Sequence, residues 1–384
     1  MTTKICNWNA GRPNTLRSGG GIALALVLAS LATSPASSQE ASAPQVSEEQ
    51  EAGGIEEIVV TAQKRQENLQ SVPISITAVT QDMLSNRDID TMDAIDRIAP
   101  NLLIVPARTS TAVAGIILRG QAQDDPSSIT LDQSVGLYVD GVYVARGNGA
   151  FQRLYDVERV EVLKGPQGTL YGRNTTGGAI NVLPNHPTDR FSVDTKFTVG
   201  NYSRREAAAA VNVPLAEGIA ARGVFVSAKR GGYAKNVFAT DPAHPESKDL
   251  DDENSFYGRL MVDADLTDNL TLSLAYDNFS DKSNGGPIVP IYFDPKGPFF
   301  RVLSPLKPSN IRVLRYNDPN GVDVKVQGAT AIATLDLDTI SIKNIFAYRE
   351  TDEVSFSDFD GTEINLIDPS SSLKRAYPLK AYTP

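Results

Sequence analysis

Residues 135–182 decide the fold and read VGLYVDGVYVARGNGAFQRLYDVERVEVLKGPQGTLYGRNTTGGAINV. The stretch opens with two short β-rich runs, Val135–Val139 and Val142–Val144, which only an Asp-Gly pair separates. Because Asp-Gly favours the positive φ angles of a type I′ turn, the two runs predict a β-hairpin. Charged and apolar residues then alternate in residues 157–163, which predicts a further strand that ends at the turn-forming Lys-Gly-Pro.

Glycines crowd the second half of this stretch, at Gly165, Gly168, Gly172, Gly177 and Gly178. Because glycine lacks a Cβ, such a segment suits backbone that passes through tight, closely packed loops. A glycine-rich loop can also cradle phosphates, but this one lacks the Lys-Ser/Thr pair that holds the β- and γ-phosphates of a nucleotide. The pattern therefore favours a structural role over nucleotide binding.

Several separate motifs in this region are similar to those of one known family. They are VDGV at residues 139–142, VEVLKGPQG at 160–168, LYGR at 170–173 and GGAIN at 177–181. In this order they closely resemble the plug domain of TonB-dependent outer-membrane receptors. The resemblance implies an α+β plug domain, residues 63–188, followed by antiparallel transmembrane β-barrel strands in residues 189–384. It also implies an export signal and an energy-coupling segment upstream of the plug.

The composition is that of a folded, acidic protein. The chain has 384 residues, of which 41% are hydrophobic and 21% charged, and its net charge is -10. No apolar run reaches the roughly 20 residues of a membrane-spanning helix. The negative charge argues against a nucleic-acid partner, because binding to phosphates depends on clustered Lys and Arg. A single cysteine, Cys6, excludes a disulfide framework and a thiolate metal site.

Residues 1–38 have the order of a secretory signal peptide. Basic residues precede a short apolar run at 21–31, and small residues follow it up to Ser38. We expect cleavage near Ser38, which would leave a mature chain without cysteine. A short buried helix is the alternative, but it gives no reason for the flanking basic and small residues. Residues 39–54 are rich in Ala, Ser, Glu and Gln and lack aromatics, so we expect a disordered linker there.

A compact β-forming run, IEEIVVTA, follows this linker directly before the plug. It comprises Ile55, Glu56, Glu57, Ile58, Val59, Val60, Thr61 and Ala62. On its residues alone it is an ordinary first strand. Its place upstream of a plug resembles the TonB box, the segment that the periplasmic partner TonB captures by strand addition. The physics suits that role, because an extended edge offers unpaired N–H and C=O groups while alternate side chains confer selectivity.

The sequence of the rest of the plug predicts a small mixed α/β sheet. The predicted strands are residues 72–79, 102–105 and 115–120, in addition to those in the opening stretch. Thr80 can cap a helix over residues 81–87, and Thr91 a second helix over residues 92–98.

Two arginines, Arg119 and Arg173, lie in otherwise apolar or glycine-rich plug motifs. Most arginines are solvated at the surface, and that interpretation stays open for both. In the resembled family the plug faces the inner wall of the barrel, where the rigid fork of arginine suits carboxylates. We therefore predict that both help to hold the plug in the barrel. The loops that we expect to reach an external ligand contain Asp124, Asp125, Arg146, Asn148 and Phe151.

Downstream of the plug, polarity alternates with a period of two. In residues 191–199 the apolar side chains fall on one face and the polar ones on the other, and the alternation returns in 256–265 and 340–349. Strands of roughly ten residues with this pattern fit a transmembrane barrel whose lumen is wet. A soluble β-sandwich also has alternating strands and is the competing interpretation.

About seven strands of this kind can be counted. They are residues 191–200, 204–215, 219–230, 255–265, 270–280, 329–338 and 340–351. The connections are tight turns at 266–270 and 337–340 and long polar loops at 231–254 and 280–328. This alternation is the periplasmic and extracellular asymmetry of outer-membrane barrels. The resembled receptors have roughly 22 strands, so we expect an incomplete barrel of that type and a truncated chain.

Residues for catalysis or metal binding are sparse. His186 and His244 lie beside prolines without a second histidine at helical spacing, which argues against a zinc protease. There is no G-x-S-x-G nucleophile motif. The acidic run 249–253 could bind Ca²⁺, but it lacks the alternating ligand spacing, so solvated acids are favoured. We expect no catalytic residue, no metal site, no cofactor and no enzyme activity.

The resemblance implies TonB-dependent, ligand-gated active transport of a scarce nutrient across the Gram-negative outer membrane. Ferric siderophores are the commonest cargo of the family, and vitamin B12, carbohydrate and aromatic cargo stay open. The implied partners are TonB with its inner-membrane energising complex, outer-membrane lipid and a small-molecule or metal-chelate ligand. We expect a monomer that binds no nucleic acid. A passive outer-membrane pore or a surface binding protein is the alternative, and neither would need residues 55–62.

Overall fold

The computed structural model describes most of the chain after residue 57. The described ranges are 58–61, 64–65, 67–107, 110–122, 132–145, 147, 153–238, 248–292, 294–297, 300–317, 319–337, 339–356, 358, 361–364 and 377–383. All of them belong to one unit, Glu56–Pro384. The predicted signal peptide and linker lie outside the described residues.

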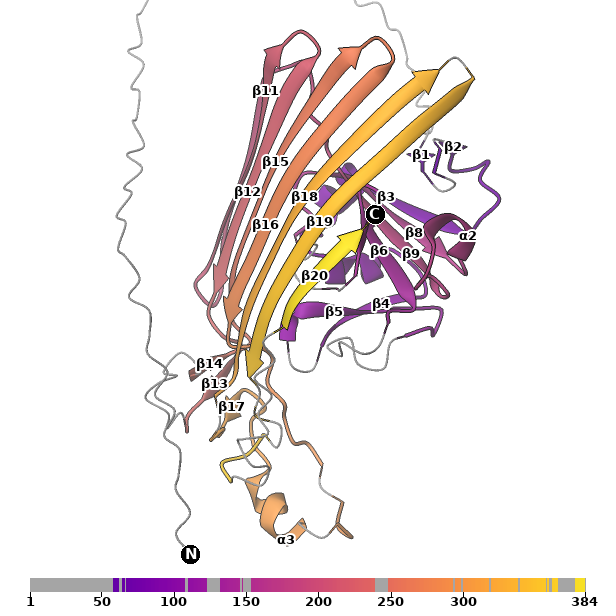
Figure 1. Ribbon diagram of the computed structural model, residues 1–384. Coiled ribbons are helices and arrows are strands. Elements are labelled where there is room, and N and C mark those ends of the chain that lie inside the picture. The colour runs from indigo at the N-terminus through magenta and orange to yellow at the C-terminus, as the bar shows by residue number, and fades with distance from the viewer. Residues whose placement is uncertain are drawn as a thin grey trace, which may run out of the picture. The chain divides into compact units, whose positions relative to one another are not determined.

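A five-stranded mixed sheet forms the centre of the plug (Figure 1). Its strands are β3 (Ile76–Thr80), β6 (Val135–Val139), β7 (Val142–Val144), β8 (Val157–Lys164) and β9 (Gly178–Pro184), in the spatial order β3-β8-β9-β6-β7. β6 and β9 are parallel, and the other neighbours are antiparallel. Every residue of β6 is buried, as expected of a strand that is covered on both faces.

The predicted hairpin is confirmed. Asp140 and Gly141 both have positive φ angles, 49° and 78°, as a type I′ turn requires. At Gly178 the backbone also requires glycine. Its φ is 151°, and a Cβ there would lie 2.3 Å from the carbonyl oxygen of Leu163. Only glycine lets these two backbones approach so closely.

Short elements complete the plug. They are β1 (Val59–Val60), β2 (Glu67–Asn68), α1 (Gln81–Asn86), the 3₁₀-helix η1 (Met92–Arg97), β4 (Leu102–Ala107), β5 (Ser110–Leu118) and α2 (Gly168–Tyr171). The Thr80 cap is confirmed, since the Met83 N–H donates to its hydroxyl at 3.4 Å. The second helix prediction is partly wrong, because residues 92–97 wind as a 3₁₀-helix and Thr91 makes no side-chain cap. None of the described helices is long and apolar enough to cross a membrane.

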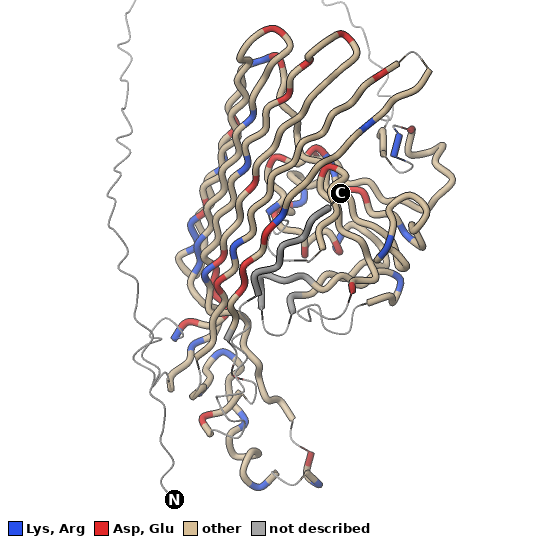
Figure 2. The backbone as a smooth tube through the Cα atoms, in the orientation of Figure 1, with Lys and Arg blue, Asp and Glu red and all other residues tan. Residues whose placement is uncertain are grey.

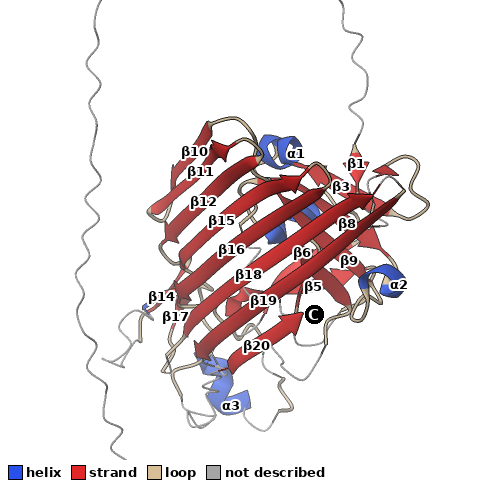
Figure 3. Cartoon of the chain, turned by 45° about the horizontal axis from the view of Figure 1, so that its top comes forward, coloured by secondary structure: helices blue, strands red, loops and turns tan. Residues whose placement is uncertain are grey.

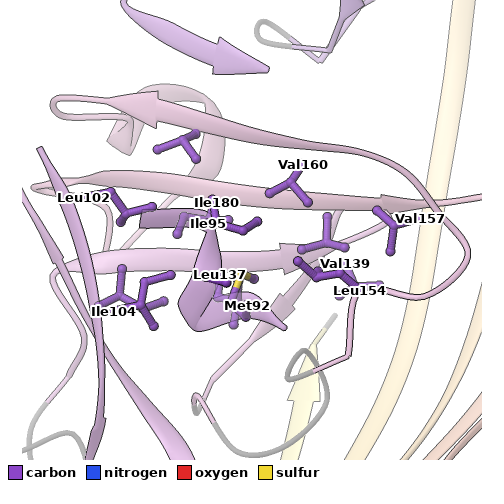
Figure 4. Close-up of a cluster of buried hydrophobic side chains, with 14 of the residues drawn as sticks. Met92, Ile95, Leu102, Ile104, Leu137, Val139, Leu154, Val157, Val160 and Ile180 are labelled. Carbon is purple, nitrogen blue, oxygen red and sulfur yellow. The ribbon is translucent and has the colours of Figure 1, made fainter. Parts of the chain in front are cut away.

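The plug core packs between the central sheet, η1 and β4. Figure 4 shows Met92 and Ile95 of η1 beside Leu137 and Ile180 of the sheet. The same hydrophobic cluster continues into the strands downstream of the plug through Phe279, Val322, Val324 and Val326. Plug and downstream strands therefore share one core.

The downstream half forms an eight-stranded antiparallel sheet (Figure 3). Its strands are β10 (Ser192–Gly200), β11 (Arg204–Ala216), β12 (Ile219–Arg230), β15 (Glu253–Thr267), β16 (Leu270–Ser283), β18 (Gly321–Leu337), β19 (Ile340–Phe356) and β20 (Tyr377–Thr383). Each strand pairs with the next in this order, and β10 and β20 are the described edges. All predicted strands are confirmed, although β18 begins at Gly321 instead of residue 329 and β20 was not predicted.

The two faces of this sheet differ in polarity, as predicted. The face that points away from the plug exposes large apolar side chains, including Phe197, Phe225, Leu260, Leu274 and Phe346. The face toward the plug buries charged side chains, including Glu206, Arg222, Asp277 and Arg349. Phe197 is 78% exposed, which is costly in water but favourable in lipid. The arrangement therefore favours a membrane-facing sheet over a soluble sandwich.

The two long connections contain a small sheet that the sequence did not predict. Its strands are β13 (Ala234–Asn236), β14 (Asp249–Leu250) and β17 (Val313–Leu314), and α3 (Phe300–Leu303) and η3 (Ser304–Leu306) precede β17. Ala234, Leu250, Leu314 and Tyr316 form its buried core. Figure 1 shows this sheet at the end of the large sheet that lies opposite the tight turns.

Candidate functional site

The described part of the predicted TonB box, residues 58–61, is docked on the plug. β1 pairs with β2 in antiparallel register, with Val59 opposite Asn68 and Val60 opposite Glu67. Val60 is fully buried, in a cluster that includes Leu163 of β8. Val59 and Val60 of this segment thus form a strand, and one of its edges is already paired. Ile55, Glu56, Glu57 and Ala62 lie outside the described residues.

A buried carboxylate holds the end of this segment. Glu161 of β8 is fully buried, and its Oε1 accepts a hydrogen bond from the Thr61 N–H at 2.7 Å. The Thr61 hydroxyl donates to its Oε2 at 2.8 Å. Arg159 Nε donates to Oε1 at 2.8 Å, and Asn181 Nδ2 donates to Oε2 at 3.4 Å. Bonds to an ionised carboxylate are shorter and stronger than neutral ones, so Glu161 is the strongest polar anchor of the docked segment.

Two tyrosines close the same site. The Tyr138 hydroxyl donates to the Tyr171 carbonyl at 2.5 Å, and the Tyr171 hydroxyl donates to the Thr61 carbonyl at 3.4 Å. Their rings meet edge to face with centroids 5.0 Å apart. Burial, with a smaller effect of Tyr143, raises the pKa of Tyr138 to about 12, and burial also raises the pKa of Tyr171. Both hydroxyls therefore stay protonated and serve as donors.

Buried ion pairs join the plug to the inner face of the large sheet. Asp156 Oδ2 accepts from Arg222 Nε of β12 at 2.7 Å. Arg153 Nη1 lies 3.4 Å from Glu206 Oε2 of β11, and Arg153 also pairs with Glu253 of β15. Burial lowers the pKa of Arg153, although Glu206 opposes this effect. Because loss of one partner would leave a buried charge uncompensated, these pairs fix the plug against the sheet.

A further plug contact comes from Asp90, which precedes η1. Lys196 Nζ of β10 lies 2.6 Å from Asp90 Oδ1, and both side chains are partly exposed. A pair in this position is screened by solvent and contributes less than the buried pairs.

His186, in the connection between β9 and β10, bridges the plug and the large sheet. Its Nδ1 lies 2.8 Å from Asp263 Oδ2 of β15, and its Nε2 lies 3.6 Å from Asp140 Oδ2 in the hairpin turn. The hydrogen bonds to Asp140 and Asp263 raise the pKa of His186 to about 9. Burial works against the ionisation of Asp140, but the His186 hydrogen bond and nearby positive charges lower its pKa overall. At neutral pH this contact is therefore an imidazolium between two carboxylates.

The predicted plug–barrel arginines, Arg119 and Arg173, are both exposed. Within the described residues, no carboxylate of the large sheet pairs with either of them. Arg119 lies in the turn after β5 with a φ of 53°, and its Nη1 covers Gly165. Their contact with a barrel wall stays a prediction. The predicted ligand-facing residues Asp124, Asp125, Arg146, Asn148 and Phe151 lie outside the described residues.

Sequence reasoning missed the residues that make these contacts. The alternation in residues 157–163 predicted a strand but no partner for Glu161, and nothing in the sequence paired Asp156 with Arg222 or His186 with Asp263. The only signal was that Asp194, Lys196 and Asp263 fall on the polar face of predicted strands. That pattern gives the direction of a side chain but not its partner.

No group of His, Cys, Asp and Glu among the described residues could hold a metal ion. In the acidic run 249–253, Asp249 pairs with Lys235, and Glu253 pairs with Arg153. These two acids therefore have cationic partners within the described residues, and the expectation that the run binds no Ca²⁺ stays a prediction.

The described residues thus form a plug with a docked N-terminal strand, tied to the charged face of a sheet whose other face is apolar, which is the arrangement of a plugged barrel. Residues 68–179 match the family described as "TonB-dependent Receptor Plug Domain". This segment is therefore a plug domain of the TonB-dependent receptors, which confirms the resemblance seen in the motifs.

Similar proteins with established names are receptors of this kind. The chain is 36% identical over 152 residues to the pesticin receptor of Yersinia pestis, covering 39% of this chain and 21% of that receptor. It is 24% identical over 243 residues to the ferric-pyoverdine 358 receptor of Pseudomonas putida, covering 62% of this chain and 26% of that receptor. The chain thus spans about a quarter or less of the length of these relatives. The matched family and these relatives are receptors by their names.

A solved structure shows the same fold. The ferric yersiniabactin uptake receptor FyuA from Yersinia pestis superposes with a TM-score of 0.60 at 23% identity, over 74% of this chain and 42% of that one. A plug domain followed by antiparallel barrel strands is therefore the fold of this chain, as the sequence predicts.

Proposed function

We propose that this protein is a TonB-dependent transporter that takes up a scarce nutrient across the Gram-negative outer membrane, with a ferric siderophore as its cargo. The names of the relatives support this cargo class, since they include a ferric-pyoverdine receptor and the catecholate siderophore receptor Fiu of Escherichia coli. Uptake of vitamin B12, a carbohydrate or an aromatic compound would be the same activity with another ligand.

The proposal assigns a role to each part of the chain. Residues 1–38 direct export, 39–54 form a linker, 55–62 are the TonB box, 63–188 the plug and 189–384 barrel strands. The apolar outer face of the large sheet supports a place in the outer membrane. The protein acts as a monomer, and its partners are TonB with the inner-membrane energising complex, outer-membrane lipid and the metal chelate.

The docked segment is the observation that carries this function. Val59 and Val60 form a strand that is paired with β2, and Thr61 is anchored by Glu161. One edge of the segment is therefore occupied and not free for a partner strand. A ligand that binds the plug more tightly when this segment is released would shift the equilibrium toward release. TonB could then add a strand to the freed segment and pull on the plug.

Deletion of residues 55–62 from the full-length protein tests the proposal. We expect uptake of radiolabelled ferric siderophore by iron-starved cells to fall to the level of cells that lack the protein, while binding at the cell surface is retained. Deletion of residues 42–49, a linker stretch of equal length, is the matched control and should leave uptake unchanged. Undiminished uptake without residues 55–62 would instead favour the passive pore.

A further inference from the structure

A polar groove opens where the large sheet meets its long connections. Its volume is about 750 Å³, and the ends of β11, β12, β15, β16 and β18 form its wall. The cationic side chains that line the groove are Arg205, Lys229, Arg230 and Lys282, and the amide side chains are Asn254, Asn284 and Asn320. Figure 2 shows Lys and Arg gathered at the lower left of the sheet, near this end. The groove is separate from the docked segment, since none of residues 58–61 lines it.

Two cations of the groove lie next to each other, which is electrostatically unfavourable when no anion is bound. Arg205 and Lys229 lie directly opposite each other on β11 and β12, and both are exposed. Like charges that face each other across a strand pair are destabilising unless an anion lies between them. Within the described part of the chain, neither side chain has an ion-pair partner.

The acids that line the groove do not provide that anion. Asp249 pairs with Lys235, and Asp323 lies 3.5 Å from Lys282. Glu253 pairs with Arg153, and Asp252 accepts a hydrogen bond from the Asn284 N–H at 2.6 Å. Arg230, a further cation of the groove, lies 4.0 Å from Asp251 and from Glu253. Among the described residues, Arg205 and Lys229 are thus the cations of the groove that have no acidic partner.

The position of these charges identifies the anion. Strand alternation places Lys229 on the same outward face as Phe225, and Asn254 on the same face as Phe256. The rings of Phe225 and Phe256 pack edge to face with centroids 5.3 Å apart and are among the exposed apolar side chains. Aromatic side chains at the rim of an apolar band mark the membrane–water interface of outer-membrane barrels. The cations thus lie at the level of the lipid headgroups.

We propose that Arg205 and Lys229 bind a phosphate group of an outer-leaflet lipid, with Asn254 and Lys282 at the flanks of the site. Clustered cations next to a membrane attract anionic headgroups, and the arginine fork suits phosphate oxygens. The acyl chains would lie on the apolar face below. This inference rests on the proposed location in the outer membrane.

The test measures lipid binding by the purified full-length protein. Native mass spectrometry compares lipid A that carries both phosphates with the same lipid after dephosphorylation. We expect the wild type to bind the phosphorylated lipid at least tenfold more tightly, and R205Q/K229Q to lose this preference. Lys282→Gln, a milder change at the flank, should weaken binding about threefold. In the matched control R301Q/K307Q, the same charge is removed from the long connection outside the groove, and binding should not change.

Several outcomes would overturn the inference. One is equal binding of both lipids by the wild type, and another is an unchanged preference in R205Q/K229Q. Binding of inorganic pyrophosphate is measured as well, to test for a soluble anion. If pyrophosphate binds the groove and phosphorylated lipid does not, the lipid assignment is wrong. Heat-modifiable migration on gels verifies that each variant is folded. Cell fractionation separates the two proposals, because absence from the outer membrane contradicts the proposed function, whereas unchanged lipid binding contradicts only this inference.

Discussion

At the scale of single residues, the contact between Thr61 and Glu161 sets how firmly the docked segment is held. Thr61→Val removes the hydroxyl that donates to Glu161 Oε2 and keeps the shape of the side chain. A hydrogen bond to a charged group contributes about 1.5–3 kcal/mol, which corresponds to a roughly tenfold to hundredfold larger released population.

The released population can be measured by thiol labelling. An Ile58→Cys reporter is expected to carry the sole thiol of the mature chain, because Cys6 is the only natural cysteine and lies in the predicted signal peptide. Thr61→Val and Glu161→Gln should both accelerate maleimide labelling of this reporter. Asp93→Asn is the control, since Asp93 is an exposed acid of η1 and belongs to neither the docked segment nor the contacts of Glu161. Equal labelling rates in all variants would show that Glu161 does not hold the segment.

His186 predicts a pH dependence of the contact between plug and large sheet. Its pKa is raised to about 9 by Asp140 and Asp263, so the folded protein binds this proton more tightly than the unfolded chain, whose value is 6.5. The stabilisation is fully present below pH 6.5 and is lost as pH rises through about 9. We expect hydrogen exchange around residues 140 and 186 to increase between pH 7 and pH 10, after correction for the intrinsic rate. In His186→Gln this pH-dependent change should vanish, and its persistence would assign the change to another group.

At the scale of elements, the outer face of β19 distinguishes a membrane sheet from a soluble one. Phe346 is 65% exposed on the apolar face. A lysine at the membrane midplane of a barrel costs about 2–4 kcal/mol, whereas a lysine on a water-exposed strand costs little. Phe346→Lys should therefore reduce the amount of folded protein in the outer membrane, and Phe346→Leu should not. Unchanged assembly of the lysine variant would contradict a lipid-facing β19.

Strands were predictable where one face is apolar and the other polar along the whole element. β12 was predicted with both ends correct, because its alternation continues from Ile219 to Arg230. β18 was predicted to start too late for a physical reason. In its first residues the apolar Val322, Val324 and Val326 turn toward the plug, and the polar residues between them face outward. The alternation is thus reversed in phase, because this end of the strand packs its apolar side chains on the plug.

The candidate site was predictable only as a segment. The composition of residues 55–62 predicted a strand, and its place before the plug motifs predicted a coupling role. Its anchor, Glu161, is distant in sequence, with Thr61 100 positions away. Such a contact depends on the fold of the intervening chain, and a single sequence holds no periodic signal for it.

At the scale of the whole molecule, the hydrophobic clusters divide the plug into two parts. The main core includes η1, the central sheet and residues of β16 and β18, so it ties the plug to the large sheet. The docked segment belongs to a separate, smaller cluster around Val60, Tyr138 and Leu163. Release of residues 58–61 therefore disturbs the small cluster and leaves the shared core and its buried ion pairs intact. We expect coupling to begin as a local release rather than as ejection of the plug.

A reversible disulfide tests this local release. Val59 and Asn68 are directly opposed in the β1–β2 ladder, where Cα atoms are about 4.5–5.5 Å apart, within the range that a disulfide spans. The oxidised V59C/N68C variant should keep surface binding of ferric siderophore but lose uptake, and a reductant should restore it. T195C/A209C, which joins opposed residues of β10 and β11, is the matched control and should transport in both states. If oxidised V59C/N68C transports at the wild-type rate, coupling does not require the separation of β1 from β2, and TonB would have to engage the segment while it is still docked.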